Sequence, residues 1–370
     1  MAKITGIEVF PLLAKFKKPF SFSGVTRVSS NNVILKINTD EGVYGVGEAC
    51  PVPAMSGETN IGICAVIKNY FEPLLKGQDP LDLAILTQKV EKCVGSNVVA
   101  KAGINIALYD LAGKLLNVPV YQLLGGKYRS EIPINGSVGL GTAEQMLETC
   151  EEQMEVAGCK YLKLYAGKEP IETDIPKLKK IIRGVGDRAQ CFLDINQQWT
   201  PKTAIKAIRS LEEDVPLLYV EQPTAKWDYE GMRFVRENVV TPIAADESVF
   251  SLSDITNLAR NQACDVITIY ALKPGGILRG HQAITMSENL GMDCFIGSYL
   301  ELGVGTAAGI HLSAAIPKLR YPCYMFGPLK YQYDVLKQDL DIKNGMVKVP
   351  EGPGLGIELD MEKLELMKYE

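Results

Sequence analysis

Three acidic residues each follow a short apolar run in the second half of the chain. Asp194 ends the run QCFLD, Glu221 follows LLYV, and Asp246 follows TPIAA. The acids are 27 and 25 residues apart, which is enough in each interval for a loop, a helix and the next strand. If the strands are parallel neighbours in a barrel, their carboxyl ends lie on one face and the three acids converge.

Converging carboxylates predict a site for a divalent cation. Without a cation the three charges repel one another and their pKa values rise. Carboxylate oxygens are ligands that suit Mg²⁺. We therefore predict that Asp194, Glu221 and Asp246 bind Mg²⁺, with Mn²⁺ as the alternative ion.

The chain around these acids alternates β-rich runs with amphipathic helices from residue 131 onward. Units of about 25 to 30 residues, each a strand followed by a helix, are typical of a βα barrel. A doubly wound sheet is the alternative, and the absence of GxGxxG after an early strand disfavours it. The predicted strands are 132–139, 160–166, 190–196, 217–223, 241–248, 265–271 and 293–301.

The first third of the chain has a different pattern. It predicts a strand at 3–12, a hairpin over 30–49 that turns at Asp40-Glu41-Gly42, and helices at 60–77, 82–95 and 99–117. Two loops, 17–30 and 51–59, fit either a mobile lid or an ordinary surface connection. Phe20, Phe22 and Met55 in these loops are candidates for substrate contact.

The length of 370 residues favours two domains. The turn at Gly125-Gly126 separates residues 1–125 from residues 126–344, and a second hairpin near 345–370 returns to the first domain.

Composition excludes several classes of function. The net charge of −5 gives no basic footprint for nucleic acid. No apolar run reaches the roughly 18 residues of a transmembrane helix, and the N-terminus does not read as a signal peptide. Nine cysteines without CxxC spacing indicate reduced thiols and a cytoplasmic location. Two histidines, His281 and His311, exclude a His-rich zinc site and argue against a Ser-His-Asp triad.

Several segments together carry a resemblance to a known family. They are ALYDLAGK, the hinge PVYQLLGG, LDINQQW, VEQP, ADES, the KPGG turn and GSYLELGVGTAAGIHL. The chain resembles the enolase superfamily over essentially its whole length, and within it the muconate lactonizing enzyme subgroup of mandelate racemase-like proteins. The resemblance implies an α/β fold, a modified (β/α)7β TIM-like barrel with an N-terminal α+β capping domain, and self-association into a homo-oligomer.

The resemblance also implies a reaction and its residues. The shared step is removal of the proton α to a carboxylate, giving an enolate that the metal stabilises. By matching position, Asp194, Glu221 and Asp246 are the metal ligands. Further positions are implied to support the ligands or to lie near the substrate: Asn196, Gln222, Glu247, Lys273 and Glu301.

The sequence departs from the family where two catalytic lysines are expected. The second lysine of a KxK motif is replaced in YLKLYAG, where Lys163 matches the first lysine and Tyr165 the catalytic one. In TIYALKPGG the catalytic position is Tyr270, and Lys273 follows three residues later. The segment YPCYMFGPL also lacks the Asp-x-Asp pair that dipeptide epimerases use, which argues against a dipeptide substrate.

Two interpretations of the tyrosines stay open. A phenol has a pKa near that of lysine, and the positive charges of Mg²⁺ and Lys163 favour the phenolate, so Tyr165 and Tyr270 could exchange protons on the two faces of a substrate. The rings could instead only shape the pocket. Lys163 is either an electrostatic helper beside the metal or itself the base.

These residues predict an Mg²⁺-dependent isomerase or lyase that acts on a small carboxylic acid through an enolate, of the epimerase, racemase or cycloisomerase type. One alternative is a dehydratase that eliminates a β-hydroxyl group. A second alternative, from a different class, is a ligand-binding pseudoenzyme whose lost lysines abolish turnover.

Overall fold

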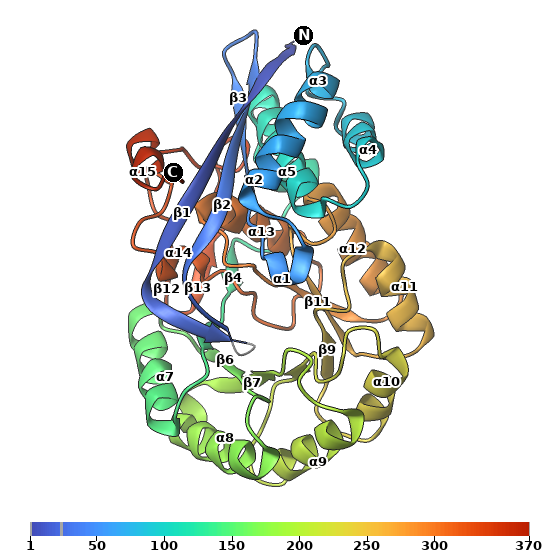
Figure 1. The fold of residues 1–370 in the computed structure, drawn as a ribbon, viewed down its shortest axis with the longest axis vertical. Coiled ribbons are helices and arrows are strands. Elements are labelled where there is room, and N and C mark those ends of the chain that lie inside the picture. The colour runs from blue at the N-terminus through green and yellow to red at the C-terminus, as the bar shows by residue number, and fades with distance from the viewer. Residues whose placement is uncertain (1, 23–24, 370) are drawn as a thin grey trace.

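The computed structural model describes residues 2–22 and 25–369. An antiparallel sheet with helices on one side forms a cap, and a curled parallel sheet surrounded by helices forms a barrel beneath it (Figure 1). The fold predicted from the sequence, a barrel with an N-terminal α+β cap, is confirmed. Within the described residues, no helix is long and apolar enough to cross a membrane.

The cap contains three strands in the order β1-β2-β3 and the helices that follow them. Its elements are β1 (Ile4–Phe22), β2 (Val25–Thr39), β3 (Tyr44–Ala49), α1 (Pro53–Ser56), α2 (Asn60–Val66), a π-helical segment (Ile67–Phe71), α3 (Glu72–Leu75), α4 (Leu83–Cys93), α5 (Val98–Leu116) and α6 (Val120–Leu123). Helix α5 packs on the sheet through small residues. A Cβ added at Gly47 would lie 2.1 Å from the carbonyl oxygen of Gly103, so glycine permits this close approach.

The barrel strands follow one another in sequence order, β5 to β11, and all pair in parallel. The strands are β5 (Gly136–Val138), β6 (Tyr161–Tyr165), β7 (Gln190–Asp194), β8 (Val220–Glu221), β9 (Ile243–Ala245), β10 (Val266–Ile269) and β11 (Asp293–Ile296). Each lies within a stretch predicted as a strand. Residues 323 and 324 close the ring, because Cys323 donates its N–H to Pro133 and Tyr324 donates its N–H to Ile296, both at 2.8 Å.

Helices cover the outside of the barrel (Figure 1). They are α7 (Ala143–Ala157), α8 (Ile171–Val185), a 3₁₀ turn (Gly186–Arg188), α9 (Pro201–Glu212), α10 (Tyr229–Glu237), α11 (Leu252–Arg260), α12 (Ile277–Asn289), α13 (Gly303–Ala314) and α14 (Gly327–Lys330). Their apolar sides pack on strands that are buried on both faces, as near-continuous apolar strand sequences predict. Helix α13 is buried along its whole length and lies between the barrel and the cap.

The C-terminal segment touches both parts of the molecule. Strands β12 (Ile342–Lys343) and β13 (Met346–Lys348) form a small sheet with β4 (Glu131–Pro133). Beyond helix α15 (Met361–Leu366), the chain hydrogen-bonds to β1, where Leu13 donates its N–H to Met367 at 2.7 Å.

One prediction about the cap is wrong. Residues 17–30 were expected to be a loop, but β1 continues to Phe22 and β2 begins at Val25. The two strands pair along most of this length, with a register shift between Lys15 and Phe20. Cross-strand pairing therefore continues through a stretch rich in Ser and Gly, and the resulting ribbon extends from the cap to the barrel (Figure 1).

The buried side chain of His311 joins three segments of the fold. Its Nδ1 accepts the N–H of Tyr121 at 3.3 Å, so its Nε2 carries the proton and donates to the carbonyl of Leu355 at 3.2 Å. Burial lowers the pKa of His311 to about 4. The sequence favoured a packing role for His311, and these contacts agree with that role.

We expect His311 to make stability depend on pH between about 6.5 and 4. The folded pKa is below the unfolded value, so the unfolded chain binds more protons in this range and stability falls as the pH falls. The loss approaches about 3 kcal/mol at pH 4. Urea unfolding at several pH values should show a shallower dependence for His311→Gln. The other histidine provides the control, because His281→Gln should keep most of the slope. An unchanged slope for His311→Gln would contradict this expectation.

Candidate active site

The three predicted acids lie together at the carboxyl end of the barrel. Asp194 is the last residue of β7, Glu221 is the last of β8, and Asp246 directly follows β9. In the parallel register Asp194 is opposite Glu221, and Glu221 is opposite Ala244. One carboxylate oxygen from each acid lies within 4.8 Å of the others, and all three residues are buried. The three carboxylates therefore converge, as their spacing in the sequence predicted.

Two buried lysines partly balance the three charges. Nζ of Lys163, on β6, lies 2.9 Å from Oδ2 of Asp194 and 2.7 Å from Oε2 of Glu221. The contact with Oε2 is out of hydrogen-bond alignment, and this oxygen has no hydrogen-bond partner among the described residues. On the other side, Lys273 forms an ion pair with Asp246 and donates to its carbonyl at 2.8 Å.

The pKa directions reflect this arrangement. Burial raises the pKa of Asp194, and burial together with Asp194 and Asp246 raises that of Glu221 to about 8 although Lys163 opposes it. Burial also acts on Asp246, but Lys273 and Lys163 outweigh burial and lower the pKa of Asp246. Burial opposes the charge of Lys163, yet Asp194 and Glu221 raise its pKa well above the usual value.

The donor set fits a divalent cation. It offers oxygen atoms only, it includes a buried oxygen of Glu221 that lacks a hydrogen bond, and its carboxylates lie close enough to share one ion. Two ammonium groups do not neutralise three carboxylates.

Tyr165 and Tyr270 flank the triad. Tyr165 ends β6 and Tyr270 follows β10, and these strands lie on opposite sides of β7, β8 and β9. The hydroxyl of Tyr270 donates to Oδ2 of Asp246 at 2.8 Å. The ring of Tyr165 contacts Phe20 and Phe22, with centroids 5.6 and 5.9 Å away.

Burial acts against the phenolate form of both tyrosines. Burial raises the pKa of Tyr165 well above its usual value, and Lys163 offsets only part of this effect. Burial and the charges of Asp246 and Glu221 raise the pKa of Tyr270 in the same direction. Burial therefore favours the neutral phenol at both positions, and the hydroxyl of Tyr270 donates to Asp246.

Neighbouring side chains hold the acids in place. Asn196 donates its N–H to Asp194 at 3.1 Å and its side-chain amide to Glu247 at 3.2 Å. Oε1 of Gln222 accepts the N–H groups of Asp246 and Ser248 at 3.0 and 3.1 Å. Asn196 and Gln222 have positive φ values of 44° and 36°, so the chain turns sharply immediately after β7 and β8.

Glu247 and Glu301 lie differently from the acids of the triad. Burial, with Asp246 and Asp194, raises the pKa of Glu247 well above its usual value, and one of its oxygens has no hydrogen-bond partner among the described residues. Glu301 was expected near the substrate. Its carboxylate instead accepts from the Ser298 hydroxyl and, at 3.1 Å, from the N–H of Tyr299, so it points into its own loop.

A small cavity of about 40 Å³ lies over the triad. The predicted residues that line it are Phe20, Phe22, Met55, Tyr165, Asp194, Asn196, Asp246 and Tyr270. Lys163, Gln222, Glu221, Glu247, Lys273 and Glu301 are not among its lining residues.

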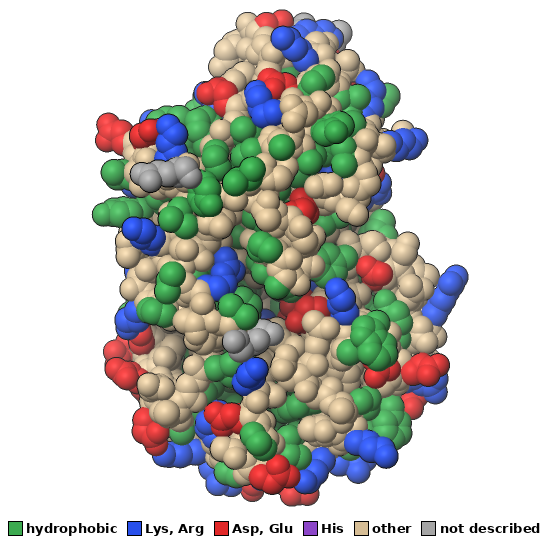
Figure 2. Space-filling view, in the orientation of Figure 1, with side chains coloured by type: hydrophobic (Ala, Val, Ile, Leu, Met, Phe, Trp, Pro, Cys, Tyr) green, Lys and Arg blue, Asp and Glu red, His purple; other side chains and the backbone are tan. Residues whose placement is uncertain are grey.

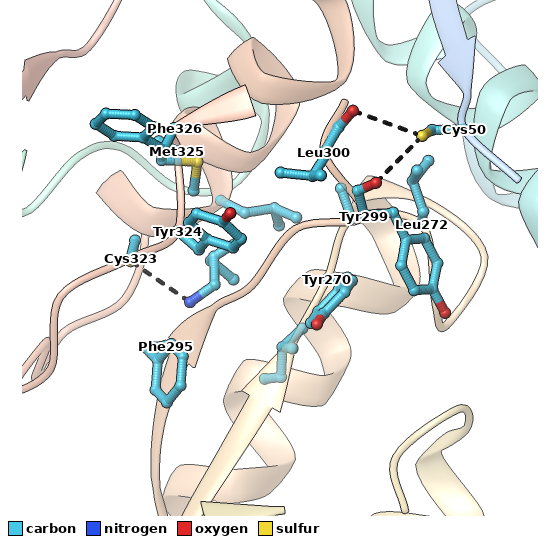
Figure 3. Packing of buried hydrophobic residues seen from close by; sticks show 14 of the residues in the cluster. Cys50, Tyr270, Leu272, Phe295, Tyr299, Leu300, Cys323, Tyr324, Met325 and Phe326 are labelled. Carbon is cyan, nitrogen blue, oxygen red and sulfur yellow. Dashed lines mark hydrogen bonds between the residues drawn. The ribbon is translucent and has the colours of Figure 1, made fainter. Parts of the chain in front are cut away.

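The sequence missed other residues at this cavity. Arg27, Ser298, Tyr299 and Tyr324 also line it. Figure 3 shows Tyr270, Tyr299 and Tyr324 gathered near the carboxyl ends of β10 and β11, and the rings of Tyr270 and Tyr299 meet edge to face at 4.8 Å. No motif marks these positions, although the run SYLE at the end of the predicted strand 293–301 was a usable signal for Tyr299.

Comparison with known proteins gives matches over the whole chain. Residues 4–125 match the mandelate racemase / muconate lactonizing enzyme N-terminal domain, and residues 145–363 match the enolase C-terminal domain-like family. An L-Ala-D/L-Glu epimerase of Clostridium acetobutylicum is 34% identical over 96% of this chain and 98% of its own length. A chloromuconate cycloisomerase of Cupriavidus necator is 33% identical over 98% of each chain.

Solved structures agree with this relationship. A muconate lactonizing enzyme from Pseudomonas fluorescens, in complex with muconolactone, superposes with a TM-score of 0.95 at 28% identity and covers 99% of each chain. An N-succinyl Arg/Lys racemase from Bacillus cereus gives a TM-score of 0.94 at 28% identity, covering 100% of this chain and 98% of its own.

We expect Mg²⁺ to raise the melting temperature and Glu221→Gln to remove most of this effect. A ligand at 100 times its Kd stabilises by about 2.7 kcal/mol, and loss of a carboxylate ligand should weaken binding by more than about 10- to 100-fold. Differential scanning fluorimetry across an Mg²⁺ titration measures the shift.

Glu58→Gln is the matched control. Glu58 is a buried acid in the cap that accepts the N–H groups of Val99 and Ala100, so its replacement should lower stability without changing the response to Mg²⁺. A full Mg²⁺ response in Glu221→Gln would contradict the assignment of the ion to the triad.

Proposed function

Since this chain is an enzyme of the enolase superfamily, in the mandelate racemase and muconate lactonizing enzyme family, we propose that it is an Mg²⁺-dependent isomerase or lyase. It removes the proton α to the carboxylate of a small acid and passes through an enolate. Mn²⁺ is the alternative ion. The proposal rests on one observation: three buried carboxylates converge on one point, with a tyrosine at the end of a flanking strand on either side.

Asp194, Glu221 and Asp246 hold the cation in this proposal, and Lys163 and Lys273 hold the carboxylates. A bound divalent cation supplies Lewis-acid stabilisation of the charge that develops on the substrate carboxylate. Lys163 is charged and engaged by two acids, which supports a positioning role rather than that of a base. Asn196, Gln222 and Glu247 fix the strand ends that carry the ligands.

Tyr165 and Tyr270 move the protons in this proposal. Both line the small cavity. The order of strands, with β6 and β10 on opposite sides of β7, β8 and β9, supports their action on two faces of a substrate. In epimerisation or racemisation, one tyrosine, as the phenolate, would take the α-proton, and the other, as the neutral phenol, would return a proton to the opposite face. A bound cation and the ammonium of Lys163 would favour that phenolate. Cycloisomerisation would require one acid to protonate the enolate. Dehydration of a β-hydroxy acid would require one base for the α-proton and one acid for the leaving hydroxyl group.

The relatives guide the choice of substrates. Their names give a dipeptide epimerase, a chloromuconate cycloisomerase and an N-succinyl amino acid racemase. The segment 321–329 lacks the Asp-x-Asp pair of dipeptide epimerases, so acids other than dipeptides are favoured. We also propose that the protein self-associates, because the family resemblance implies a homo-oligomer.

The test is exchange of the α-proton in D₂O, followed by NMR with Mg²⁺ and a library of α-substituted acids that includes dipeptides, muconates and N-acyl amino acids. Once a substrate is found, Tyr165→Phe and Tyr270→Phe should each lower exchange by about 10²- to 10⁴-fold. For an epimerase, each variant should lose exchange with a different enantiomer.

Tyr109→Phe is the control, because Tyr109 is a buried tyrosine of the cap helix α5. If neither active-site variant changes turnover, the tyrosines only shape the pocket. If no compound exchanges although Mg²⁺ binds, the protein is the ligand-binding pseudoenzyme rather than an enzyme of enolate chemistry.

A further inference from the structure

Tyr299 is a buried tyrosine of the small cavity whose hydroxyl the fold does not use. The residue is 4% exposed and lines the cavity over the triad. Its hydroxyl has no hydrogen-bond partner within residues 2–22 and 25–369. A buried hydroxyl without a partner loses its hydration and gains no bond in return, so such a group requires an explanation.

Two other tyrosines of this cavity have protein partners for their hydroxyls. Tyr270 donates to Asp246 and Tyr324 donates to Ser137, both at 2.8 Å. Tyr299 contacts the ring of Tyr270 edge to face, with centroids 4.8 Å apart. A phenylalanine would make the same ring contact, so packing does not account for the hydroxyl of Tyr299.

The backbone of Tyr299 is held on both sides. Its N–H donates to Oε1 of Glu301 at 3.1 Å, and its carbonyl accepts the thiol of Cys50 at 3.5 Å. Glu301 also accepts the hydroxyl of Ser298, so one carboxylate ties the loop together. Figure 3 shows the carbonyl of Tyr299 facing Cys50 and the ring extending away from that contact. The loop therefore fixes the phenol in place through its backbone and leaves the hydroxyl free.

The hydroxyl of Tyr299 is a neutral donor near the triad. Burial raises the pKa of Tyr299 well above its usual value, and the charge of Asp246 adds to this effect. The phenol therefore keeps its proton and can donate it in a hydrogen bond. A carboxylate that a cation draws to the triad brings acceptor oxygens into the cavity that Tyr299 lines.

The cavity lies where the surface of the molecule is hollowed. Figure 2 shows this hollow where the β1–β2 ribbon meets the barrel, and Phe22 and Arg27 of the ribbon line the cavity together with Tyr299. The cavity volume of about 40 Å³ has room for about three water molecules. A carboxylate that replaces such water would take over as acceptor for the phenol.

We propose that Tyr299 is a substrate-binding residue whose hydroxyl donates to an oxygen of the carboxylate held at the triad, and that Glu301 positions it. This inference rests on the proposed function for the place of that carboxylate. As the α-proton leaves, negative charge develops on the carboxylate oxygens, and a donor already in place stabilises the enolate more than the starting acid. Glu301 then serves the substrate without touching it, although it points into its own loop.

The test uses oxalate, a small planar dianion whose oxygens resemble those of an enolate. Oxalate is titrated into the Mg²⁺-loaded protein by calorimetry, and the same titration into Mg²⁺ buffer is subtracted. Tyr299→Phe should weaken oxalate binding about 10- to 100-fold, because a hydrogen bond to an anion is lost. The response of the melting temperature to Mg²⁺ should be unchanged in this variant, which shows that the triad is intact.

Stability separates a binding role from a structural one. Without oxalate, Tyr299→Phe should keep or raise the melting temperature, because the hydroxyl that is removed has no partner in the fold. Tyr331→Phe provides the contrast, because the buried hydroxyl of Tyr331 donates to the carbonyl of Leu300. Its melting temperature should fall by about 2 °C or more. Tyr109→Phe, in the cap helix α5, should leave the oxalate affinity unchanged.

A double-mutant cycle tests the role of Glu301. Glu301→Gln should weaken oxalate binding about 3- to 10-fold, because the N–H of Tyr299 loses a charged acceptor and the phenol is held less firmly. In the Tyr299→Phe background the same change should leave the affinity unaltered, since Glu301 acts through the hydroxyl that is missing there. Equal effects in the two backgrounds would refute the positioning role.

Three results would overturn the proposal. They are an oxalate affinity that Tyr299→Phe leaves unchanged, a melting temperature of Tyr299→Phe that falls as far as that of Tyr331→Phe, and failure of oxalate to bind the Mg²⁺-loaded protein at about 10 mM. Because binding is measured without turnover, the two proposals fail separately. If oxalate binding depends on Tyr299 but no acid exchanges its α-proton, the proposed reaction is refuted and the binding role stands. If exchange occurs while Tyr299→Phe binds oxalate normally, the reaction stands and this inference fails.

Discussion

Repulsion among three buried carboxylates is the constraint on which the centre of this protein depends. Asp194, Glu221 and Asp246 offer oxygens within 4.8 Å of one another, and burial removes the water that would screen them. Lys163 bridges two of the acids and Lys273 binds the third. Two lysines leave one negative charge over, which gives the site its affinity for a cation. A barrel brings the three acids together because neighbouring parallel strands present their carboxyl ends on one face.

The tyrosines change the electrostatics of this centre. Lysines at positions 165 and 270 would place two more ammonium groups beside the carboxylates. A phenol is neutral, and the burial of Tyr165 and Tyr270 raises their pKa values further. The proposed enzyme therefore carries out proton transfer in a site that is less positive before the metal binds, and the cation takes a larger share of the charge stabilisation.

The cap is attached to the barrel through buried polar contacts as well as apolar ones. Glu48, on β3, accepts the N–H groups of Leu302 and Gly305 at 2.8 Å, at the start of α13. A carboxylate at a helix N-terminus is favourable, since the orphan N–H groups and the helix dipole both attract it. This contact fixes the base of the cap, so that the β1–β2 ribbon is held over the barrel and Phe20 reaches the ring of Tyr165.

The sequence by itself determined the barrel, the cap and the positions of the three acids. These features depend on local patterns: a strand–helix repeat, and an acid placed where a strand ends. It also drew attention to Tyr165 and Tyr270, both of which line the small cavity. Only the tertiary structure decided which way side chains point. Glu301 turns into its own loop because Leu300 takes a left-handed conformation with φ of 67°.

The long ribbon, the contact of Phe20 with Tyr165, and the approach of Lys330 to the ring of Phe20 also required the folded chain. Phe20 and Lys330 are 310 positions apart in the sequence. Contacts of that kind follow from packing between the cap and the end of the barrel. A local sequence pattern does not specify which distant side chains will contact each other.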